Sequence, residues 1–248
     1  MDKRPNTKVI AIIQARMGAT RLPGKVLEDI AGEPMLARVV NRVRRSRSVD
    51  DAVIATTTQP ADEAIISLCQ ERSWSFFRGS ENDVLDRYYH AASAFRADAV
   101  VRVTSDCPLI DPEVIDEVLG EFLSHHPKVE YVSNVLIRTF PRGLDVEAMA
   151  FDTLEKAWRE GSNPSWREHV TPYIWRHPEK FRICNVANDT DYSYMRWCVD
   201  TSEDLAFVRK VYDCFQNDAF TWRQVLRLLE KHPEWLEINQ HVRQKAVP

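Results

Sequence analysis

The sequence lacks the features that mark membrane-spanning, secreted and zinc-binding proteins. No run approaches the roughly 20 consecutive apolar residues of a membrane span, and the opening residues, MDKRPNTK, lack the apolar core of a signal peptide. The five cysteines are widely spaced and form no C-x-x-C pair, which excludes a zinc knuckle and a thioredoxin-type centre. We therefore expect a cytoplasmic protein with free thiols and no membrane partner.

An excess of positive charge is also absent. The net charge is -4 at pH 7, so the chain lacks the electrostatic footprint of a protein that binds nucleic acid or anionic membranes. The arginine cluster in residues 42–47 shares a helical pattern with Val39, Val40 and Val43, which favours a solvated helix face over an RNA site. We expect no nucleic-acid partner.

Length and composition are ordinary for a globular protein: 248 residues, 44% hydrophobic and 28% charged. Such a length accommodates one large α/β domain or two small ones. Because the chain has no internal repeat, low-complexity segment or linker, we predict one domain over residues 1–248. In this prediction residues 1–7 are a loose N-terminus and residues 202–248 carry the C-terminal helices.

The first half of the chain alternates short apolar runs with segments of helical spacing. The runs at residues 9–13, 51–57, 75–77 and 99–103 have the length and composition of strands. Helical spacing follows them at residues 30–47 (beginning near Pro34), 61–72, 79–95 and 112–123. This alternation predicts an α/β fold, with a mostly parallel sheet and helices on both faces.

The second half is less regular. We predict strands at residues 130–136, 145–150, 181–186 and 194–199, and helices at residues 151–159, 165–176, 202–215 and 221–231. In parallel sheets, ligands bind beyond the carboxyl ends of the strands. The loops after residues 13, 55 and 103 therefore belong to one edge of the sheet. This edge brings together the following residues: Arg16, Lys25, Thr56 and Asp106.

The first predicted strand runs into a basic loop. Arg16, Arg21 and Lys25 follow it, with two glycines and a proline between them. Backbone N–H groups approach phosphate oxygens closely where there is no Cβ, and the cations neutralise phosphate charge. The spacing matches neither the Walker pattern nor G-x-G-x-x-G. The loop is either a phosphate cradle or a basic surface loop, and spacing alone does not separate the two.

Two carboxylates follow predicted strands. Asp106 comes after the strand at residues 99–103 and precedes Pro108, and Asp200 comes after the strand at residues 194–199 and precedes a helix. Taken singly, Asp106 is as well suited to an Asx turn and Asp200 to a helix cap. Together with the basic loop they suggest a magnesium site, since Mg²⁺ is commonly held by one or two carboxylates plus substrate phosphates.

Several stretches resemble the nucleotidyltransferases that activate sugars as CMP derivatives. The first is IIQARMGATRLPGKVLEDIAGEPML, followed by FRGSENDVLDRYYHAA, VRVTSDCPLIDP, SNVLIRTFPRGLDVE, REHVTPYI and WCVDTSEDL. They occur in the family's order and cover nearly the whole chain. The family includes CMP-Kdo and CMP-sialic acid synthetases, and the resemblance is closest to its SpsF-like branch (spore coat polysaccharide biosynthesis protein F).

The resemblance implies a Rossmann-like α/β fold of the nucleotide-diphospho-sugar transferase type, and Mg²⁺-dependent nucleotidyl transfer. In the relatives, an acceptor oxygen attacks the α-phosphate of CTP and pyrophosphate leaves, in the synthesis of polysaccharide or glycoconjugate precursors. The implied partners are a nucleoside triphosphate, with CTP favoured, and a small acidic or sugar acceptor. A homodimer is implied as well, and we place its contact at the irregular segment of residues 134–147.

The resemblance also assigns roles to individual residues. Arg16, Lys25, Asp106 and Asp200 are the implied catalytic residues, and the two aspartates are the implied Mg²⁺ ligands. The implied nucleotide-binding residues are Ala15, Arg16, Gly18, Arg21, Lys25, Thr56, Asp83, Arg87 and Ser105. The implied acceptor-binding residues are Arg142, Asp145, Glu147, Arg167 and His169.

Some of these assignments have alternatives. Arg87 lies one helical turn from Asp83 and suits an ion pair with it as well as a ligand contact. A guanidinium fork at Arg142 or Arg167 suits a carboxylate or phosphate of the acceptor. His169 is either a general base or a packed or surface histidine, and we favour the latter. The family loop usually has serine at the position of Ala19, so we expect altered nucleotide affinity.

Other functions remain compatible with the sequence. A glycosyltransferase of the same fold, using a nucleotide-sugar donor, usually carries a D-x-D motif at mid-chain, where this chain reads SDCP. A guanylyltransferase acting on a sugar-1-phosphate would use GTP instead of CTP. A non-catalytic nucleotide-binding protein is disfavoured by the joint presence of the four implied catalytic residues. The acceptor is open among keto-sugar acids, sugar-1-phosphates and phosphonate-like acids.

Overall fold

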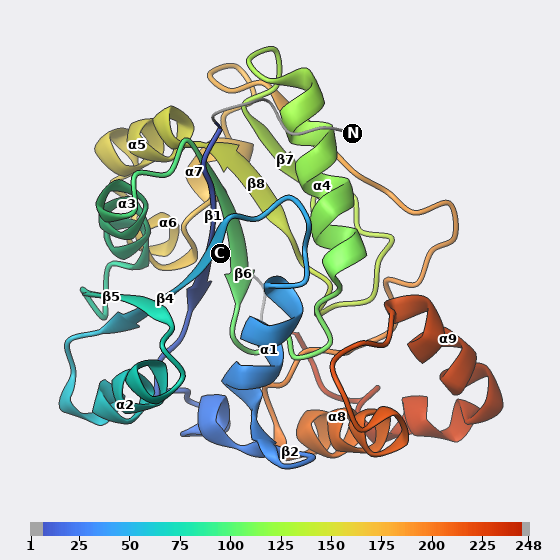
Figure 1. The fold of residues 1–248 in the computed structure, drawn as a ribbon. Coiled ribbons are helices and arrows are strands. Elements are labelled where there is room, and N and C mark those ends of the chain that lie inside the picture. The colour runs from blue at the N-terminus through green and yellow to red at the C-terminus, as the bar shows by residue number, and fades with distance from the viewer. Residues whose placement is uncertain (1–6, 245–248) are drawn as a thin grey trace.

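A mixed sheet forms the centre of the computed structural model, which describes residues 7–244 (Figure 1). Its strand order is β5-β4-β1-β6-β8-β7-β9. In chain order the strands are β1 Val9–Gln14, β4 Asp51–Thr57, β5 Ser75–Gly79, β6 Ala99–Thr104, β7 Tyr131–Ser133, β8 Glu147–Ala150 and β9 Ile183–Asn185. Strand β8 is antiparallel to both neighbours, and the other pairings are parallel. The predicted mostly parallel α/β sheet is confirmed.

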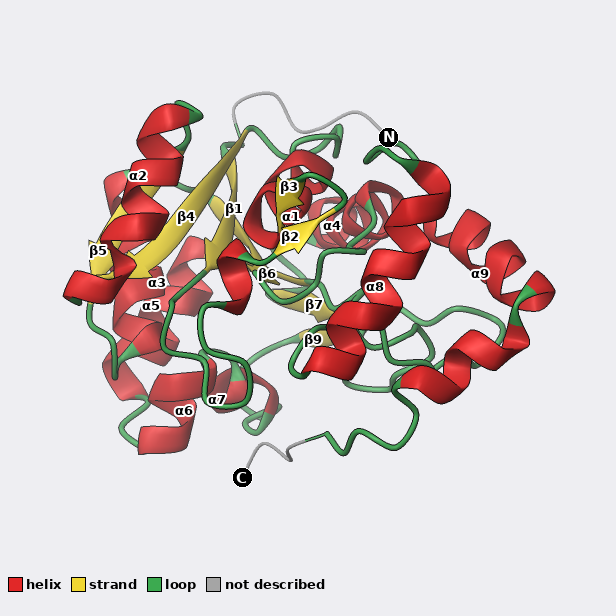
Figure 2. Cartoon of the chain, turned by 90° about the horizontal axis from the view of Figure 1, so that it is seen from below, coloured by secondary structure: helices red, strands yellow, loops and turns green. Residues whose placement is uncertain are grey.

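Helices cover both faces of the sheet because its strands are apolar on both sides. Val9, Ala11 and Ile13 of β1 face one core and Ile10 and Ile12 face the other, and all five are fully buried. The first core is covered by α1 Met35–Val43, α2 Glu63–Glu71, α4 Pro112–His125 and α8 Ser202–Phe215. The second is covered by α3 Val84–Ala94, α5 Phe151–Glu160 and α7 Pro172–Trp175. Figures 1 and 2 show α3, α5 and α6 Pro164–His169 together on one side of the sheet and α1 and α4 on the other.

The parallel register aligns the carboxyl ends of the three central strands. Gln14, the last residue of β1, lies opposite Ala55 of β4 and opposite Thr104 of β6. The loops that leave these strands therefore start at one edge of the sheet, as predicted. This edge is where ligands bind in open α/β sheets.

The region after the basic loop differs from the prediction. The helix expected over residues 30–47 is preceded by a hairpin of β2 Asp29–Ile30 and β3 Glu33–Pro34, and α1 begins only at Met35. Ala31 and Gly32 form the hairpin turn with φ angles of 52° and 86°. Positive φ at both central residues matches the right-handed twist of short hairpins. Two 3-10 turns, Lys25–Leu27 and Pro60–Asp62, flank the site edge.

The predicted helix at residues 165–176 is two helices, α6 Pro164–His169 and α7. Val170 between them has φ of 73°, and Pro172 starts α7 without an N–H group to continue the first helix. The predicted strands at residues 130–136, 145–150 and 181–186 are each shorter than expected.

The strand predicted at residues 194–199 is wrong. This segment bonds to loops instead of a strand: the Trp197 N–H donates to Arg142 O at 2.7 Å, and the Val199 N–H donates to Asp106 O at 2.8 Å. Only an isolated bridge between Arg142 and Arg196 is present in this part of the described chain. The apolar run is extended and buried, but its hydrogen bonds attach it to the edge that carries Asp106.

The C-terminal helices match the prediction closely. They are α8 and α9 Trp222–Lys231, followed by the 3-10 helix Pro233–Ile238. Thr201 and Thr221 each form a capping box, with Asp204 and Gln224 respectively, which fixes where the two helices begin. All five cysteines are free. Within residues 7–244, no helix is both long and apolar enough to cross a membrane.

Candidate active site

A cavity of about 290 Å³ lies at the carboxyl ends of β1 and β6. Its lining is dominated by polar and charged side chains from the basic loop, both strand ends, the start of α3, the end of α6 and the turn before α8. The lining residues are Gln14, Ala15, Arg16, Ala19, Thr20, Arg21, Lys25, Val26, Val84, Arg87, Thr104, Ser105, Asp106, Glu168, His169 and Asp200. All four implied catalytic residues are among them.

The basic loop is held in place by backbone bonds and one buried carboxylate. Asp62 is 2% exposed and accepts a hydrogen bond from the Met17 N–H at 2.7 Å. The Gly24 N–H donates to Met17 O at 2.9 Å, which closes the loop. Gly24 has φ of 75°, a left-handed conformation that favours glycine, and the 3-10 turn that follows directs Lys25 inward.

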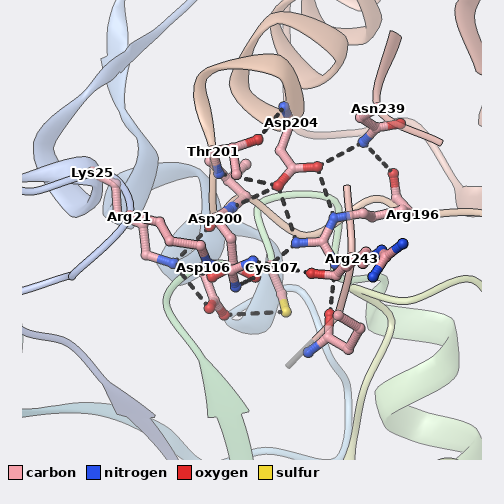
Figure 3. A network of polar contacts seen from close by, with 12 residues as sticks. Arg21, Lys25, Asp106, Cys107, Arg196, Asp200, Thr201, Asp204, Asn239 and Arg243 are labelled. Carbon is pink, nitrogen blue, oxygen red and sulfur yellow. Dashed lines mark hydrogen bonds and ion pairs between the residues drawn. The ribbon is translucent and has the colours of Figure 1, made fainter. Parts of the chain in front are cut away.

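Lys25 joins the two implied metal ligands (Figure 3). Its Nζ donates to Asp106 Oδ2 at 3.1 Å, to Asp200 Oδ1 at 2.9 Å and to Val199 O at 2.6 Å. An ammonium group has three N–H donors, so these contacts use all of them. In this conformation Lys25 orients the carboxylates and has no donor left for a phosphate.

Electrostatics keep Lys25 and Asp200 ionised. Burial opposes charge on Lys25, but Asp106 and Asp200 outweigh it and raise the pKa of Lys25 above its ordinary value. Burial also opposes charge on Asp200, but the attraction of Lys25, then of Arg196 and Arg21, lowers the pKa of Asp200. Both groups are therefore charged at neutral pH.

Two cations of the cavity retain unused donors. Arg16 is half-buried, and no hydrogen bond or ion pair of its side chain is found within residues 7–244. Arg87 is 1% exposed; its Nη1 donates to Ser80 O at 2.6 Å, but its Nε has no partner in the described chain. Burial lowers the pKa of Arg87. A buried donor without an acceptor is costly, so these guanidinium groups favour an anion in the cavity.

The remaining implied nucleotide-binding residues fall into two groups. Ala15 and Ser105 line the cavity, whereas Gly18, Thr56 and Asp83 do not. Thr56 is fully buried, and Asp83 caps α3 by accepting from the Asp86 N–H at 2.9 Å. The alternative pairing of Asp83 with Arg87 is not formed; its partner is Arg167.

Three of the implied acceptor-binding residues are engaged in intramolecular ion pairs. Asp145 accepts both prongs of the Arg138 guanidinium, at 2.5 and 2.8 Å. Glu147 is 4% exposed and pairs with Arg102. Arg167 Nη2 donates to Asp83 Oδ2 at 2.6 Å. These contacts order the loops and helices around the cavity.

Arg142 and His169 are the two acceptor candidates whose side chains have no hydrogen-bond or ion-pair partner within residues 7–244. Burial and the neighbouring Arg138 lower the pKa of Arg142 because both disfavour its positive charge. An acceptor anion bound beside Arg142 would stabilise that charge. His169 is the last residue of α6 and lines the cavity. Partial burial outweighs the charge of Glu168 and lowers the pKa of His169, which leaves a neutral imidazole at pH 7.

Sequence reasoning missed a second layer behind Asp200. Arg196 binds Asp200 and Asp204, and Asn239 binds Asp204. The segment that carries Arg196 was predicted as a strand, so no site was expected from it. The sequence does offer one signal: Arg196 lies four residues before Asp200, and Asp204 lies four residues after it. Gln14, Thr104 and other lining residues were also missed, because strand ends reveal no side-chain direction.

Similarity to known proteins identifies the family of this chain. A protein-family profile described as cytidylyltransferase matches residues 10–246. The chain belongs to the cytidylyltransferase family. It is therefore a nucleotidyltransferase enzyme, and the alternatives of a glycosyltransferase and a non-catalytic binding protein are set aside.

Relatives of this cytidylyltransferase come from both archaea and bacteria. An uncharacterised protein of Methanocaldococcus jannaschii is 37% identical over 244 residues, which cover 96% of this chain and 97% of that protein. Spore coat polysaccharide biosynthesis protein SpsF of Bacillus subtilis is 30% identical over 234 residues, which cover 91% and 95%. A 3-deoxy-manno-octulosonate cytidylyltransferase of Anaeromyxobacter dehalogenans is 41% identical over 114 residues, 45% of this chain and 46% of that enzyme. The resemblance to the SpsF-like branch is confirmed.

Solved structures share the fold of this cytidylyltransferase. A cytidylyltransferase from Leptospira borgpetersenii has a TM-score of 0.90 at 33% identity and covers 97% of this chain and 100% of that one. A CMP:2-keto-3-deoxy-manno-octonic acid synthetase complexed with CTP has a TM-score of 0.61 at 21% identity, covering 84% and 99%. The second likeness shows the fold alone, and it confirms the predicted Rossmann-like architecture.

Proposed function

We propose that this cytidylyltransferase transfers CMP from CTP to a small acidic acceptor, such as a sugar acid, and releases pyrophosphate. One observation carries the proposal: a cavity at the sheet edge is surrounded by Arg16, Arg21, Lys25 and Arg87 and adjoins the paired carboxylates of Asp106 and Asp200. Cations around a polar cavity suit a triphosphate. The relatives named for cytidylyl transfer to 3-deoxy-manno-octulosonate support CTP and a sugar acid.

The two carboxylates fit a divalent ion together with a substrate. Asp106, in the loop after β6, and Asp200, in the turn before α8, point at one shared cation, the Nζ of Lys25. Within residues 7–244 no group of three or more acidic, histidine or cysteine side chains is placed to hold a metal ion, so the protein alone offers an incomplete set of ligands. Two carboxylates plus phosphate oxygens is the donor set that Mg²⁺ commonly takes. In such a site Mg²⁺ supplies charge neutralisation at the phosphate oxygens.

The chain's own residues bind and orient the two substrates in this proposal. Arg16 and Arg87 line the cavity and have donors without a partner within residues 7–244, so they neutralise the triphosphate; Arg21 adds charge where it pairs with Asp200 at 2.6 Å. Arg142, whose guanidinium has no hydrogen-bond or ion-pair partner in the part of the chain that the structure describes, binds the acceptor's carboxylate. His169 is a neutral imidazole in the cavity that can accept a proton from an acceptor hydroxyl. Nucleotidyl transfer needs little covalent help, because positioning and electrostatics lower the barrier.

A matrix assay tests the proposal. The purified protein is mixed with Mg²⁺, one of the four nucleoside triphosphates, and a keto-sugar acid, a sugar-1-phosphate or a phosphonate-like acid, and pyrophosphate is measured. We expect release only with CTP and an acidic acceptor, and none with Asp106→Asn. Release with GTP and a sugar-1-phosphate would contradict the proposal and indicate a guanylyltransferase.

Nucleotide binding is measured on the same panel without an acceptor. A nucleotide at 100 times its Kd stabilises the fold by about 2.7 kcal/mol, which thermal unfolding detects readily. We expect CTP with Mg²⁺ to raise the unfolding temperature more than the other three triphosphates. Equal shifts by all four would contradict cytosine selectivity.

A further inference from the structure

Arg196 is a buried cation that does not line the cavity. Its side chain is 6% exposed, and it precedes Asp200 by four residues on the extended segment before α8. The two side chains meet because Nη2 of Arg196 donates to Asp200 Oδ2 at 2.7 Å. Arg196 therefore acts on the cavity only through Asp200.

Every prong of the guanidinium has an acceptor (Figure 3). The Nε donates to Asp204 Oδ1 at 2.8 Å, and Nη2 donates to Asp204 Oδ2 at 3.0 Å. The third nitrogen, Nη1, donates to Gln244 Oε1 at 2.5 Å. This bidentate geometry fixes the plane of the guanidinium, and with it the position of the nitrogen that binds Asp200.

Asp204 fixes the backbone of the same turn. It is fully buried, and its Oδ2 accepts from the N–H groups of Asp200 at 2.9 Å and Thr201 at 3.1 Å. Asn239 Nδ2 donates to Asp204 Oδ1 and to Arg196 O, both at 2.9 Å. The start of α8, the extended segment and the C-terminal part of the described chain are thus connected behind one carboxylate.

We propose that Arg196 is a positioning residue that sets the orientation of the Asp200 carboxylate. With Oδ2 held by Arg196 and Arg21, the other oxygen, Oδ1, is the one that faces Lys25 and Asp106. The inference rests on the proposed function, in which Asp106 and Asp200 hold a divalent ion with the triphosphate. Partners behind a metal-binding carboxylate typically change metal affinity or activity 10–100-fold when they are removed.

Lysine cannot replace Arg196 in this arrangement. An ammonium group is a point charge without the planar fork that spans two carboxylates. Arg196→Lys keeps the charge and loses the simultaneous contacts to Asp200 and Asp204. The variant therefore isolates orientation from charge.

The experiment measures Mn²⁺ affinity in the presence of CTP by electron paramagnetic resonance, with unfolding and kinetics beside it. We expect Arg196→Lys to weaken Mn²⁺ affinity by about 10–100-fold and to raise the Mg²⁺ concentration for half-maximal activity in parallel. Asn239→Ala, which loosens the network further from the cavity, should act in the same direction with a smaller effect. If Arg196→Lys does not fold, the Mn²⁺ affinity of Asn239→Ala alone tests the inference.

The matched control is Arg38→Lys. Arg38 is a buried arginine whose prongs bind Ile30 O, Ala31 O and Asp218, away from the cavity. We expect it to lower stability and leave Mn²⁺ affinity unchanged. Wild-type Mn²⁺ affinity in folded Arg196→Lys and Asn239→Ala would overturn the inference alone. Absence of CTP-dependent Mn²⁺ binding in the wild-type protein would overturn the proposed function with it.

Discussion

The Asp200 carboxylate contacts three cations of the site. It receives Lys25 on one oxygen and Arg21 and Arg196 on the other. Neutralising it leaves three cations with reduced compensation and removes one proposed ion ligand. A bound metal ion stabilises transition-state charge by several kcal/mol, and about 1.36 kcal/mol corresponds to a tenfold change in rate. We therefore expect the loss of a metal ligand to lower kcat/KM by at least about 100-fold.

We therefore predict such a loss for Asp200→Asn and for Asp106→Asn, measured as pyrophosphate release from CTP. Asp213→Asn is the matched control, since Asp213 lies exposed on α8 and should retain wild-type activity. Activity within a few-fold of wild type in both site variants would show that these carboxylates are not the ion ligands.

Gly143 is a residue whose replacement should destabilise the fold. Its φ is 107°, and a Cβ there would lie 2.7 Å from Cys198 N and from the carbonyl carbon of Trp197. Both contacts are backbone, which cannot move aside cheaply. Gly143→Ala should lower the free energy of unfolding by at least about 1–3 kcal/mol.

Chemical denaturation measures this effect, with Gly120→Ala as the opposite control. Gly120 lies inside α4 and a Cβ there meets nothing within 4 Å, so alanine should add about 0.5–1 kcal/mol through helix propensity. Equal stability of the two variants would show that the close approach of residues 143 and 197–198 is incorrect.

At the scale of elements, the Asp83–Arg167 pair joins α3 to α6. Arg167 donates to Asp83 from Nε and Nη2 and to Trp158 O from Nη1, at 2.6 to 2.9 Å. Its side chain is only 18% exposed. A double-mutant cycle with Asp83→Asn and Arg167→Met should give a coupling free energy of about 0.5–3 kcal/mol.

The control cycle uses Arg223 and Glu113, which are 56% and 54% exposed. An exposed pair is worth about 0.2–1 kcal/mol, so its coupling should be smaller. A coupling of zero for the Asp83–Arg167 pair would mean that α6 is positioned by its apolar contacts alone.

The elements also show where sequence reasoning succeeds. The strands β1, β4 and β6 and the helices α4, α8 and α9 were predicted nearly to their ends, because uninterrupted apolar runs and capping residues mark them locally. The parallel pairing of these strands then placed Arg16, Lys25 and Asp106 at one edge before any contact was known.

The wrong strand at residues 194–199 and the unforeseen pairing of Arg167 both depend on non-local contacts. The segment at residues 194–199 has the composition of a strand, but its N–H groups bond to Asp106 and Arg142 in loops. The pairing of Arg167 with Asp83 depends on how α6 packs against α3. Neither can be inferred from local spacing.

For the whole molecule, we propose a homodimer through residues 134–147. Ile137 is 70% exposed and Tyr194 is 69% exposed, and their loops are joined where the Tyr192 N–H donates to Thr139 O at 2.7 Å. The two joined loops leave Ile137 and Tyr194 largely exposed, and neither side chain is covered by another part of the described chain. We predict a dimer in sedimentation at micromolar concentration and a monomer for the double variant Ile137→Lys, Tyr194→Lys. A wild-type monomer would refute this proposal.

The proposed function requires that the protein breaks the bond between the α- and β-phosphates of CTP. The most direct measurement uses CTP labelled with ³²P at the α- or the γ-position, with Mg²⁺ and a keto-sugar acid. The α-label should move to the acceptor, and the γ-label should appear only in pyrophosphate. Release of γ-label as inorganic phosphate, with the α-label left in CDP, would contradict the account.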